Sequence, residues 1–235
     1  MRALDVASAA WDNWNATQAV ARAALLENVG SSIEADHDEI LALIVRENGR
    51  TIMDAHAEVR EAIDFLRYYA SECRRLFSSE IELPGPAGEN NRLSLGGRGV
   101  VVAISPWNFP ASIFVGQIAA TLAARNTIIA KPAEQSSLVA ARICDEFYRA
   151  GIPVDVLQFL PGRGPEVGAM LLTDPRIAAV AFTGSTKVAR LIAAQLVANP
   201  GPTTALVAET GGINCMIVDS CTTRAGRRGR HQFGL

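Results

Sequence analysis

One stretch decides the fold, residues 99–134, which read GVVVAISPWNFPASIFVGQIAATLAARNTIIAKPAE. Residues 100–104 form an apolar, β-branched run, which predicts a strand buried on both faces. The spacing of apolar residues from 113 to about 125 predicts a helix, and residues 127–130 predict a second buried strand. Strand, helix and strand in this order indicate a βαβ unit with a right-handed crossover.

Polar residues follow both of these strands. Pro106 and Pro110 exclude a straight continuation of the first strand, so we expect an irregular loop that carries Trp107 and Asn108. The second strand leads into Lys131. The carboxyl ends of parallel strands share one edge of a sheet, where open α/β sheets bind their ligands. The sequence therefore predicts a ligand site at this edge.

Helical and strand patterns alternate along the chain and predict an α/β fold, an N-terminal helical layer plus a Rossmann-like parallel sheet. The expected helices are 16–30, 34–48, 51–77, 136–150, a short one from about 165, and 187–197. The expected strands are 157–160, 178–182, 205–208 and 215–218, with a short strand or hairpin piece near 92–95. We expect helices with a connecting loop (1–98) and an α/β core (99–220) in one domain, then a basic tail (221–235).

Composition excludes several classes of function. The 235 residues are 49% hydrophobic and 20% charged, as in an ordinary globular protein. The net charge of −2 gives no electrostatic case for nucleic acid or an anionic membrane, and no apolar segment approaches the roughly 20 residues of a membrane span. The four cysteines, Cys73, Cys144, Cys215 and Cys221, show no metal-ligand spacing, so we expect no metal site. We expect each to be a small buried hydrophobe, and this use of cysteine suits a cytoplasmic protein.

A second group of residues has the chemistry of a nucleotide site. Gly184, Ser185 and Thr186 lie between a predicted strand and a helix, where glycine allows close approach and free N–H groups can meet a phosphate; plain helix capping is the alternative. Lys131 and Glu134 could both hold ribose hydroxyls. A carboxylate there would repel a 2′-phosphate, which favours NAD over NADP.

Two further side chains suit acyl chemistry. Asn108 offers an amide donor in a proline-bounded loop, a group used to stabilise an oxyanion. Glu209, between a predicted strand and two glycines, is a candidate general base, with an ordinary loop carboxylate as the alternative. The three histidines give no convincing Ser/His/Asp set, because two lie on the N-terminal helices and one in the basic tail.

Five motifs, SPWNFP, KPAEQ, PGRG with Gly168, FTGST and ETGG, resemble the aldehyde dehydrogenase superfamily in their order and spacing. The segments EVREAIDFLRYYA, GQIAATLAARN, FTGSTKVARLIAAQL and AETGGINCMIVDS are similar to the L-glutamate γ-semialdehyde (pyrroline-5-carboxylate) dehydrogenase domain of bifunctional bacterial proline utilization A proteins. The resemblance covers roughly residues 10–220.

The resemblance implies roles for individual residues. Asn108 would donate to the oxyanion of the thiohemiacetal, and Glu209 would activate the water that hydrolyses the thioester. The residues implied to bind NAD are Ile104, Ser105, Pro106 and Trp107 on the nicotinamide side, Lys131, Ala133 and Glu134 around the adenosine ribose, Gly164, Gly168, Phe182, Thr183, Gly184, Ser185 and Val188 at adenine and pyrophosphate, and Thr210 and Gly211 near the nicotinamide. Ala189 departs from the wider superfamily, where many members have glycine, but agrees with the closer subgroup.

The family's nucleophilic cysteine is expected about 30 residues or more beyond the ETGG turn, in a motif like GQRCSA, and this sequence has no such motif. Cys215 and Cys221 lie too close to Glu209 to be that residue. The sequence changes abruptly after Ser220 into CTTRAGRRGRHQFGL, which we interpret as a frameshifted or otherwise aberrant end. A basic nucleic-acid tail is the alternative interpretation.

The function implied by the resemblance is NAD-dependent oxidation of L-glutamate γ-semialdehyde to L-glutamate in proline catabolism. Its substrate would be a small aldehyde, and the full-length parent could form homo-oligomers. Without the thiolate, no covalent acyl intermediate forms by this route. The second hypothesis is therefore an inactive fragment that at most binds a dinucleotide.

Overall fold

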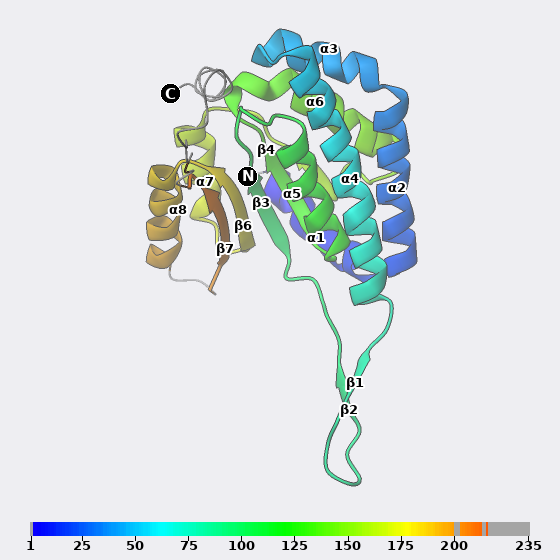
Figure 1. The fold of residues 1–235 in the computed structure, drawn as a ribbon. Coiled ribbons are helices and arrows are strands. Elements are labelled where there is room, and N and C mark those ends of the chain that lie inside the picture. Colours follow the sequence, from blue (N-terminus) through cyan, green and yellow to red (C-terminus); the bar gives the residue numbers. More distant parts are fainter. Residues whose placement is uncertain (1, 200–202, 213–214, 216–235) are drawn as a thin grey trace, which may run out of the picture.

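The computed structural model describes residues 2–199, 203–212 and 215 (Figure 1). The helices are α1 (Arg2–Ala16), α2 (Ala19–Ala35), α3 (His37–Asn48), α4 (Ile52–Phe77), α5 (Ser112–Ala123), α6 (Ser137–Arg149), α7 (Ala169–Leu172) and α8 (Thr186–Ala198). The strands are β1 (Ile81–Leu83), β2 (Asn91–Leu93), β3 (Val100–Ile104), β4 (Thr127–Lys131), β5 (Leu157–Phe159), β6 (Ile177–Gly184) and β7 (Ala205–Thr210). A 3₁₀ turn (Glu134–Ser136) precedes α6, and a π-helical turn (Gly164–Gly168) precedes α7.

The main sheet has five parallel strands in the order β5-β4-β3-β6-β7. Apolar side chains on alternate positions of β3 and β4 face two separate cores. One core contains α2 to α6, and the other contains α7, α8 and the start of α1. Helices therefore cover both faces of the sheet, which confirms the predicted α/β class.

The helical layer is held together mainly by α4, which packs against both α2 and α5. Thr51 caps α4 by accepting a hydrogen bond of 3.1 Å from the backbone N–H of Asp54. Gly49 ends α3 with a left-handed φ of 67°, which glycine adopts without strain. The layer continues into the hairpin of β1 and β2, which projects away from the body (Figure 1).

Helix α1 was not assigned bounds from the sequence, yet it is a buried part of the sheet's second face. Leu4 and Ala7 are fully buried, and the Ala7 carbonyl accepts a hydrogen bond of 3.0 Å from the Thr127 hydroxyl on β4. Trp14 donates its indole N–H to the Leu122 carbonyl at the end of α5, over 3.2 Å. These contacts tie the first helix to both sides of the βαβ unit.

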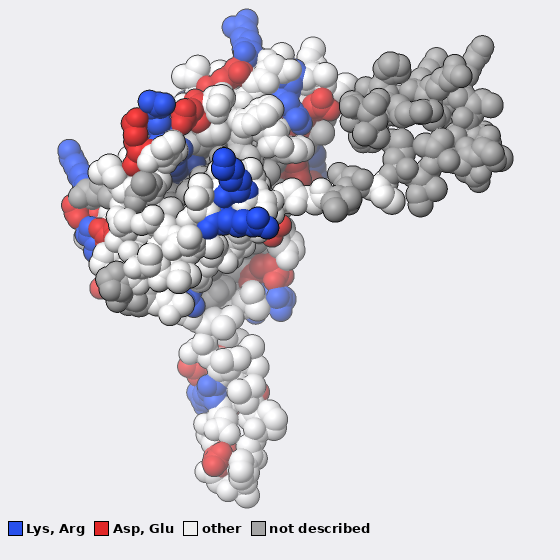
Figure 2. Space-filling model, turned by 90° about the vertical axis from the view of Figure 1, so that its left-hand side faces the viewer, with Lys and Arg blue, Asp and Glu red and all other residues white. Residues whose placement is uncertain are grey.

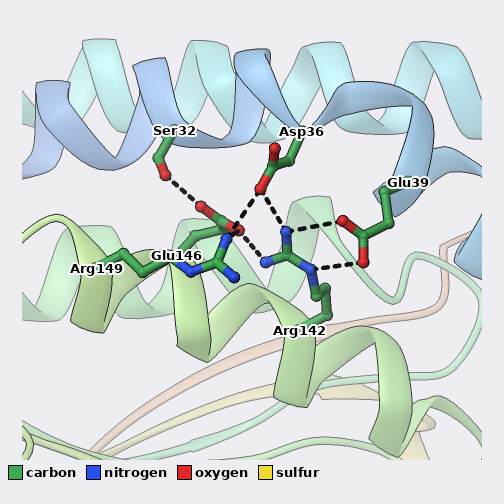
Figure 3. A network of polar contacts seen from close by, with 6 residues as sticks. All are labelled: Ser32, Asp36, Glu39, Arg142, Glu146 and Arg149. Carbon is green, nitrogen blue, oxygen red and sulfur yellow. Dashed lines mark hydrogen bonds and ion pairs between the residues drawn. The ribbon is translucent and has the colours of Figure 1, made fainter.

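A network of charged side chains attaches α6 to α2 and α3 (Figure 3). Arg142 reaches Asp36 over 2.5 Å and Glu39 over 3.1 Å, and it also pairs with Glu146. Glu146 is fully buried and also lies 3.1 Å from Arg149. Because a buried carboxylate needs partners, this network fixes the position of α6 rather than forming a reactive site.

Charged side chains of both signs lie on the face of the molecule shown in Figure 2. On the face shown in Figure 2, acidic and basic side chains are interspersed and no continuous basic surface is seen. None of the helices in the described ranges is long and apolar enough to cross a lipid bilayer. The arginine-rich tail (221–235) and the strand expected at 215–218 lie outside the described residues, apart from Cys215 itself.

Candidate nucleotide site

The topology of the sheet produces a crevice beside β3. Helix α5 carries the chain from β3 to β4 on one side, and β6 pairs with β3 on the other side. Strand order therefore reverses at β3, and Ile104 at its carboxyl end lies between Lys131 of β4 and Phe182 of β6. In open α/β sheets this topological switch point is where ligands bind.

The loop after β3 is tied to both neighbouring strands. The Ser105 N–H donates to the Lys131 carbonyl over 3.1 Å, and the Ser105 hydroxyl donates to Oε1 of Gln117 over 2.7 Å. The amide nitrogen of Gln117 donates in turn to the Thr183 hydroxyl over 3.2 Å. Gln117, which the sequence reasoning missed, thus links β3, α5 and β6. Its signal was a lone amide in an otherwise apolar helix.

A cavity of about 320 Å³ opens on the α8 side of this edge. Five of the residues expected around the nucleotide line it: Ile104, Lys131, Gly164, Gly168 and Val188. The other side of the cavity is apolar, with leucine and isoleucine side chains from α7 and α8. An apolar cavity of this size with a few polar groups is typical of a small-molecule site.

Lys131 is the charged group inside this cavity. Its side chain is only 3% exposed, and its ammonium donates to the neighbouring Pro132 carbonyl over 3.1 Å. Burial lowers the pKa of Lys131, because removal from water disfavours the charged form; the nearby Glu134 carboxylate opposes this shift. A ligand that supplies hydroxyl or carbonyl acceptors would therefore stabilise the charged form of this buried ammonium.

Glu134 is bonded to Gly164, one of the residues that line the cavity. Its Oε1 accepts a hydrogen bond of 2.8 Å from the Gly164 N–H, which joins the loop after β4 to the turn before α7. Only one of the two carboxylate oxygens takes part in this bond. Ala133, the residue before it, is half-buried in the same loop. Glu134 therefore lies close enough to Lys131 to act on its ammonium electrostatically.

Helix α8 begins at the carboxyl end of β6. Ser185 is its cap and accepts a hydrogen bond of 3.3 Å from the Val188 N–H. Gly184 is the last residue of β6 and Thr186 the first of α8, so only Ser185 lies between the two elements. The strand runs further than expected because Gly184 still pairs with Thr210 of β7.

A side chain at Gly184 would collide with its own strand. An added Cβ would lie 2.7 Å from the Phe182 ring, which is a rigid obstacle because that ring is 4% exposed. Glycine therefore lets the backbone approach Phe182 closely at the start of α8.

A second cavity, of about 470 Å³, lies on the opposite face of the sheet, between α4, α5 and the strands β6 and β7. Phe182, Thr183 and Glu209 are among its lining residues. Glu209 is within β7, paired with Thr183, and not in a turn as the sequence suggested. Its strand continues because β6 supplies a hydrogen-bonding partner as far as Thr210, and the exposed Gly211 follows.

The remaining candidates lie on the outer part of the β3 loop. Trp107 is 58% exposed, Asn108 is also exposed, and Pro106 is half-buried. The Trp107 carbonyl accepts a hydrogen bond of 3.1 Å from Asn48, a residue that the sequence reasoning did not single out. The structure thus places Asn108 at the same sheet edge as the nucleotide cavity, on a loop fixed from the helical layer.

The cysteines take two kinds of position. Cys73 and Cys144 are buried, as expected, and burial raises the pKa of each thiol. Cys215 is exposed, which contradicts the expectation of a buried hydrophobe; it lies past the end of β7 and not within a strand. Within the described ranges, no group of three or more His, Cys, Asp or Glu side chains could hold a metal ion.

Comparisons with known proteins agree with this architecture. The model of the aldehyde dehydrogenase family matches residues 1–224. The bifunctional protein PutA of Klebsiella aerogenes is 48% identical over 210 residues, which are 88% of this chain and 15% of PutA.

Solved structures of similar proteins have the same fold over most of this chain. The crystal structure of a variant of Bradyrhizobium japonicum proline utilization A superimposes with a TM-score of 0.88 at 49% identity, covering 90% of this chain and 22% of that one. A 1-pyrroline-5-carboxylate dehydrogenase from Thermus with bound NAD gives a TM-score of 0.85 at 39% identity, covering 89% of this chain and 41% of that one.

The chain thus spans about a fifth of the solved proline utilization A chain and about two fifths of the Thermus enzyme. The match of nearly the whole chain to one family model, with a superimposable parallel sheet, decides its classification. This chain belongs to the aldehyde dehydrogenase family.

Proposed function

We propose that the chain binds NAD at the carboxyl edge of β3, β4 and β6, as the cofactor-binding part of an L-glutamate γ-semialdehyde dehydrogenase. The observation that carries the proposal is the cavity at the switch point, which brings Lys131, Gly164, Gly168 and Val188 together. Membership of the family and the NAD bound to the Thermus relative support it.

In this proposal each part of the nucleotide meets a different element. Lys131 and the free oxygen of Glu134 hold the adenosine ribose, and the adenine lies against Val188 on the apolar side of α8. The N–H groups at the start of α8 face the pyrophosphate, because helix N-termini attract anions. The carboxylate of Glu134 disfavours a 2′-phosphate, so NAD is preferred to NADP.

The reaction of the complete parent would take place on the loop after β3 and at β7. NAD, when bound, supplies the hydride acceptor. Asn108 would donate its amide N–H to the oxyanion that develops from the aldehyde carbonyl. Glu209 would take a proton from the water that releases the acid product. Glu209 lines the second cavity together with Thr183, one of the residues proposed to bind the cofactor.

The nucleophile of this chemistry has no counterpart in the printed sequence, which lacks a GQRCSA-like motif. For the chain as printed we therefore expect NAD binding without aldehyde-dependent NADH formation. The exposed Cys215 is the thiol that would have to act if turnover were seen.

Titration calorimetry with NAD, run beside an aldehyde-dependent NADH assay, tests the proposal. Binding of NAD without turnover supports it. Turnover that is lost in Cys215→Ser would overturn the assignment of an inactive chain. Absence of NAD binding by a protein that is folded by circular dichroism would overturn the cofactor assignment.

A further inference from the structure

The loop that carries Asn108 packs against the helical layer. Three side chains contact it: Asn48 at the end of α3, Arg50 between α3 and α4, and Glu58 in α4. Each contacts a different part of the loop. Together they define what we call the loop support, and none of them was expected to have a role from the sequence.

Glu58 is the buried member of the loop support. It is 2% exposed, and its Oε1 accepts hydrogen bonds from the Ala111 N–H over 2.7 Å and from the Ser112 N–H over 3.4 Å. These N–H groups are at the start of α5, where the cap residue Ala111 has no side-chain acceptor of its own. Glu58 therefore caps α5 from another helix, and its negative charge lies at the positive end of the helix dipole.

Arg50 connects Glu58 with the exposed part of the loop. Its guanidinium lies 4.7 Å from the centre of the Phe109 ring, within the range of a cation–π contact. Its Nε is 3.7 Å from Oε2 of Glu58, too far for a hydrogen bond, so the attraction between them is electrostatic. A continuous path thus runs from Phe109 through Arg50 and Glu58 to the N–H of Ala111.

Asn48 holds the loop from the other side of Asn108. Its amide nitrogen donates to the Trp107 carbonyl over 3.1 Å and to the Ser136 hydroxyl over 2.8 Å. Ser136 is the residue before α6, but its side chain makes no capping bond to that helix and accepts from Asn48 instead. The loop after β3 and the loop after β4 therefore share one anchor.

We propose that Glu58 and Arg50 are positioning residues, which fix the loop between Trp107 and Ala111 so that Asn108 faces the nicotinamide side of the site. The direction of Asn108 rests on the proposed function, whereas the ordering of the loop by Glu58 and Arg50 does not. Burial raises the pKa of Glu58, but the two N–H bonds and the charge of Arg50 favour its carboxylate form.

Hydrogen exchange of the 105–115 segment tests the ordering of the loop in the chain itself. In Glu58→Ala, the Ala111 and Ser112 amides lose a charged acceptor, and we expect them to exchange about 10-fold to 100-fold faster. Glu58→Gln keeps an acceptor and restores part of the protection. Asp64→Asn, at an exposed carboxylate on the same helix, is the matched control and leaves exchange at Ala111 and Ser112 unchanged.

Ligand binding tests the direction of the loop. ADP-ribose lacks the nicotinamide, so its Kd stays within about twofold in Glu58→Ala and Arg50→Gln, whereas NAD loses its advantage over ADP-ribose. A merely structural role would instead weaken both ligands together. Arg50→Gln keeps the experiment decisive if Glu58→Ala does not fold, because Arg50 is partly exposed.

The outcomes distinguish a failure of the positioning role from a failure of the proposed NAD binding. Unchanged exchange at Ala111 and Ser112 in Glu58→Ala and in Arg50→Gln would overturn the positioning role. Equal loss of ADP-ribose and NAD affinity in both variants would also overturn it. If the unchanged chain binds neither ligand while exchange responds as expected, the proposed function fails and the ordering of the loop stands.

Discussion

Replacing Lys131 with methionine should weaken NAD binding and stabilise the fold at the same time. The ammonium is buried, with 3% of the residue exposed, and the bond to the Pro132 carbonyl is its hydrogen bond in the structure. Methionine has a similar length and no charge, so it fills the same space without the desolvation penalty. Loss of a charged hydrogen bond to the ribose, about 1.5–3 kcal/mol, corresponds to a roughly 10-fold to 150-fold higher Kd.

The stability effect has a defined pH dependence. Because burial lowers the pKa of Lys131 below its usual 10.5, the unfolded chain binds more protons than the folded chain between these two pKa values. The free energy of unfolding of the natural chain therefore rises with pH through that window. Lys131→Met lacks this rise, so its advantage in stability is largest below the lowered pKa and shrinks as the pH rises toward 10.5.

Two measurements check this prediction, titration calorimetry with NAD and urea unfolding followed by circular dichroism from pH 7 to pH 10. A gain of about 1 kcal/mol would raise the melting temperature by roughly 2–4 °C. Lys187→Met, at the chain's other lysine on the exposed side of α8, is the control for stability and should leave the free energy of unfolding unchanged. Lower stability at neutral pH with unchanged NAD affinity would refute the reasoning.

Three other changes have defined outcomes. Gly184→Ala brings a Cβ to 2.7 Å from the Phe182 ring, so urea unfolding should show a loss of about 1–3 kcal/mol; an unchanged transition would mean that the ring moves freely. Ser185→Ala removes the cap of α8 and should lower the free energy of unfolding by about 0.5–2 kcal/mol, while Ser185→Thr keeps most of it; equal losses in both would argue against the cap. The hydrogen bond from Arg176 lowers the pKa of Asp174 below 3.8, so its stabilisation is complete above that pH and is lost as the pH falls through the lowered pKa. Unfolding of Arg176→Gln and the natural chain should therefore differ at pH 7 and converge at about pH 2, and a constant difference would contradict this.

The central βαβ unit could be predicted from sequence because buried parallel strands are continuous apolar runs. Strand β3 has the expected limits, and β4 extends one residue further, to Lys131. Sequence reasoning placed the ends of β6 and β7 too early. Polar residues such as Thr183 and Glu209 look like a turn, but each pairs with the neighbouring strand, and this pairing is a property of the sheet.

Residues that act across elements were not predictable. Glu58 lies in a helix whose buried face is otherwise apolar, and only the packed structure shows that it meets the start of α5. Gln117 is similar, since its hydrogen bonds join Ser105 in the loop after β3 to Thr183 in β6. Lys131 and Glu134, in contrast, could be proposed from their place at the end of a strand, because the carboxyl ends of parallel strands converge.

A crystal structure of the chain with NAD tests the central claim most directly. The account predicts adenosine density in the cavity between Lys131 and Val188, a ribose hydroxyl within hydrogen-bonding distance of the Lys131 ammonium, and the pyrophosphate facing the start of α8. Density for NAD elsewhere on the molecule, with this cavity unchanged, would contradict the assignment of the site.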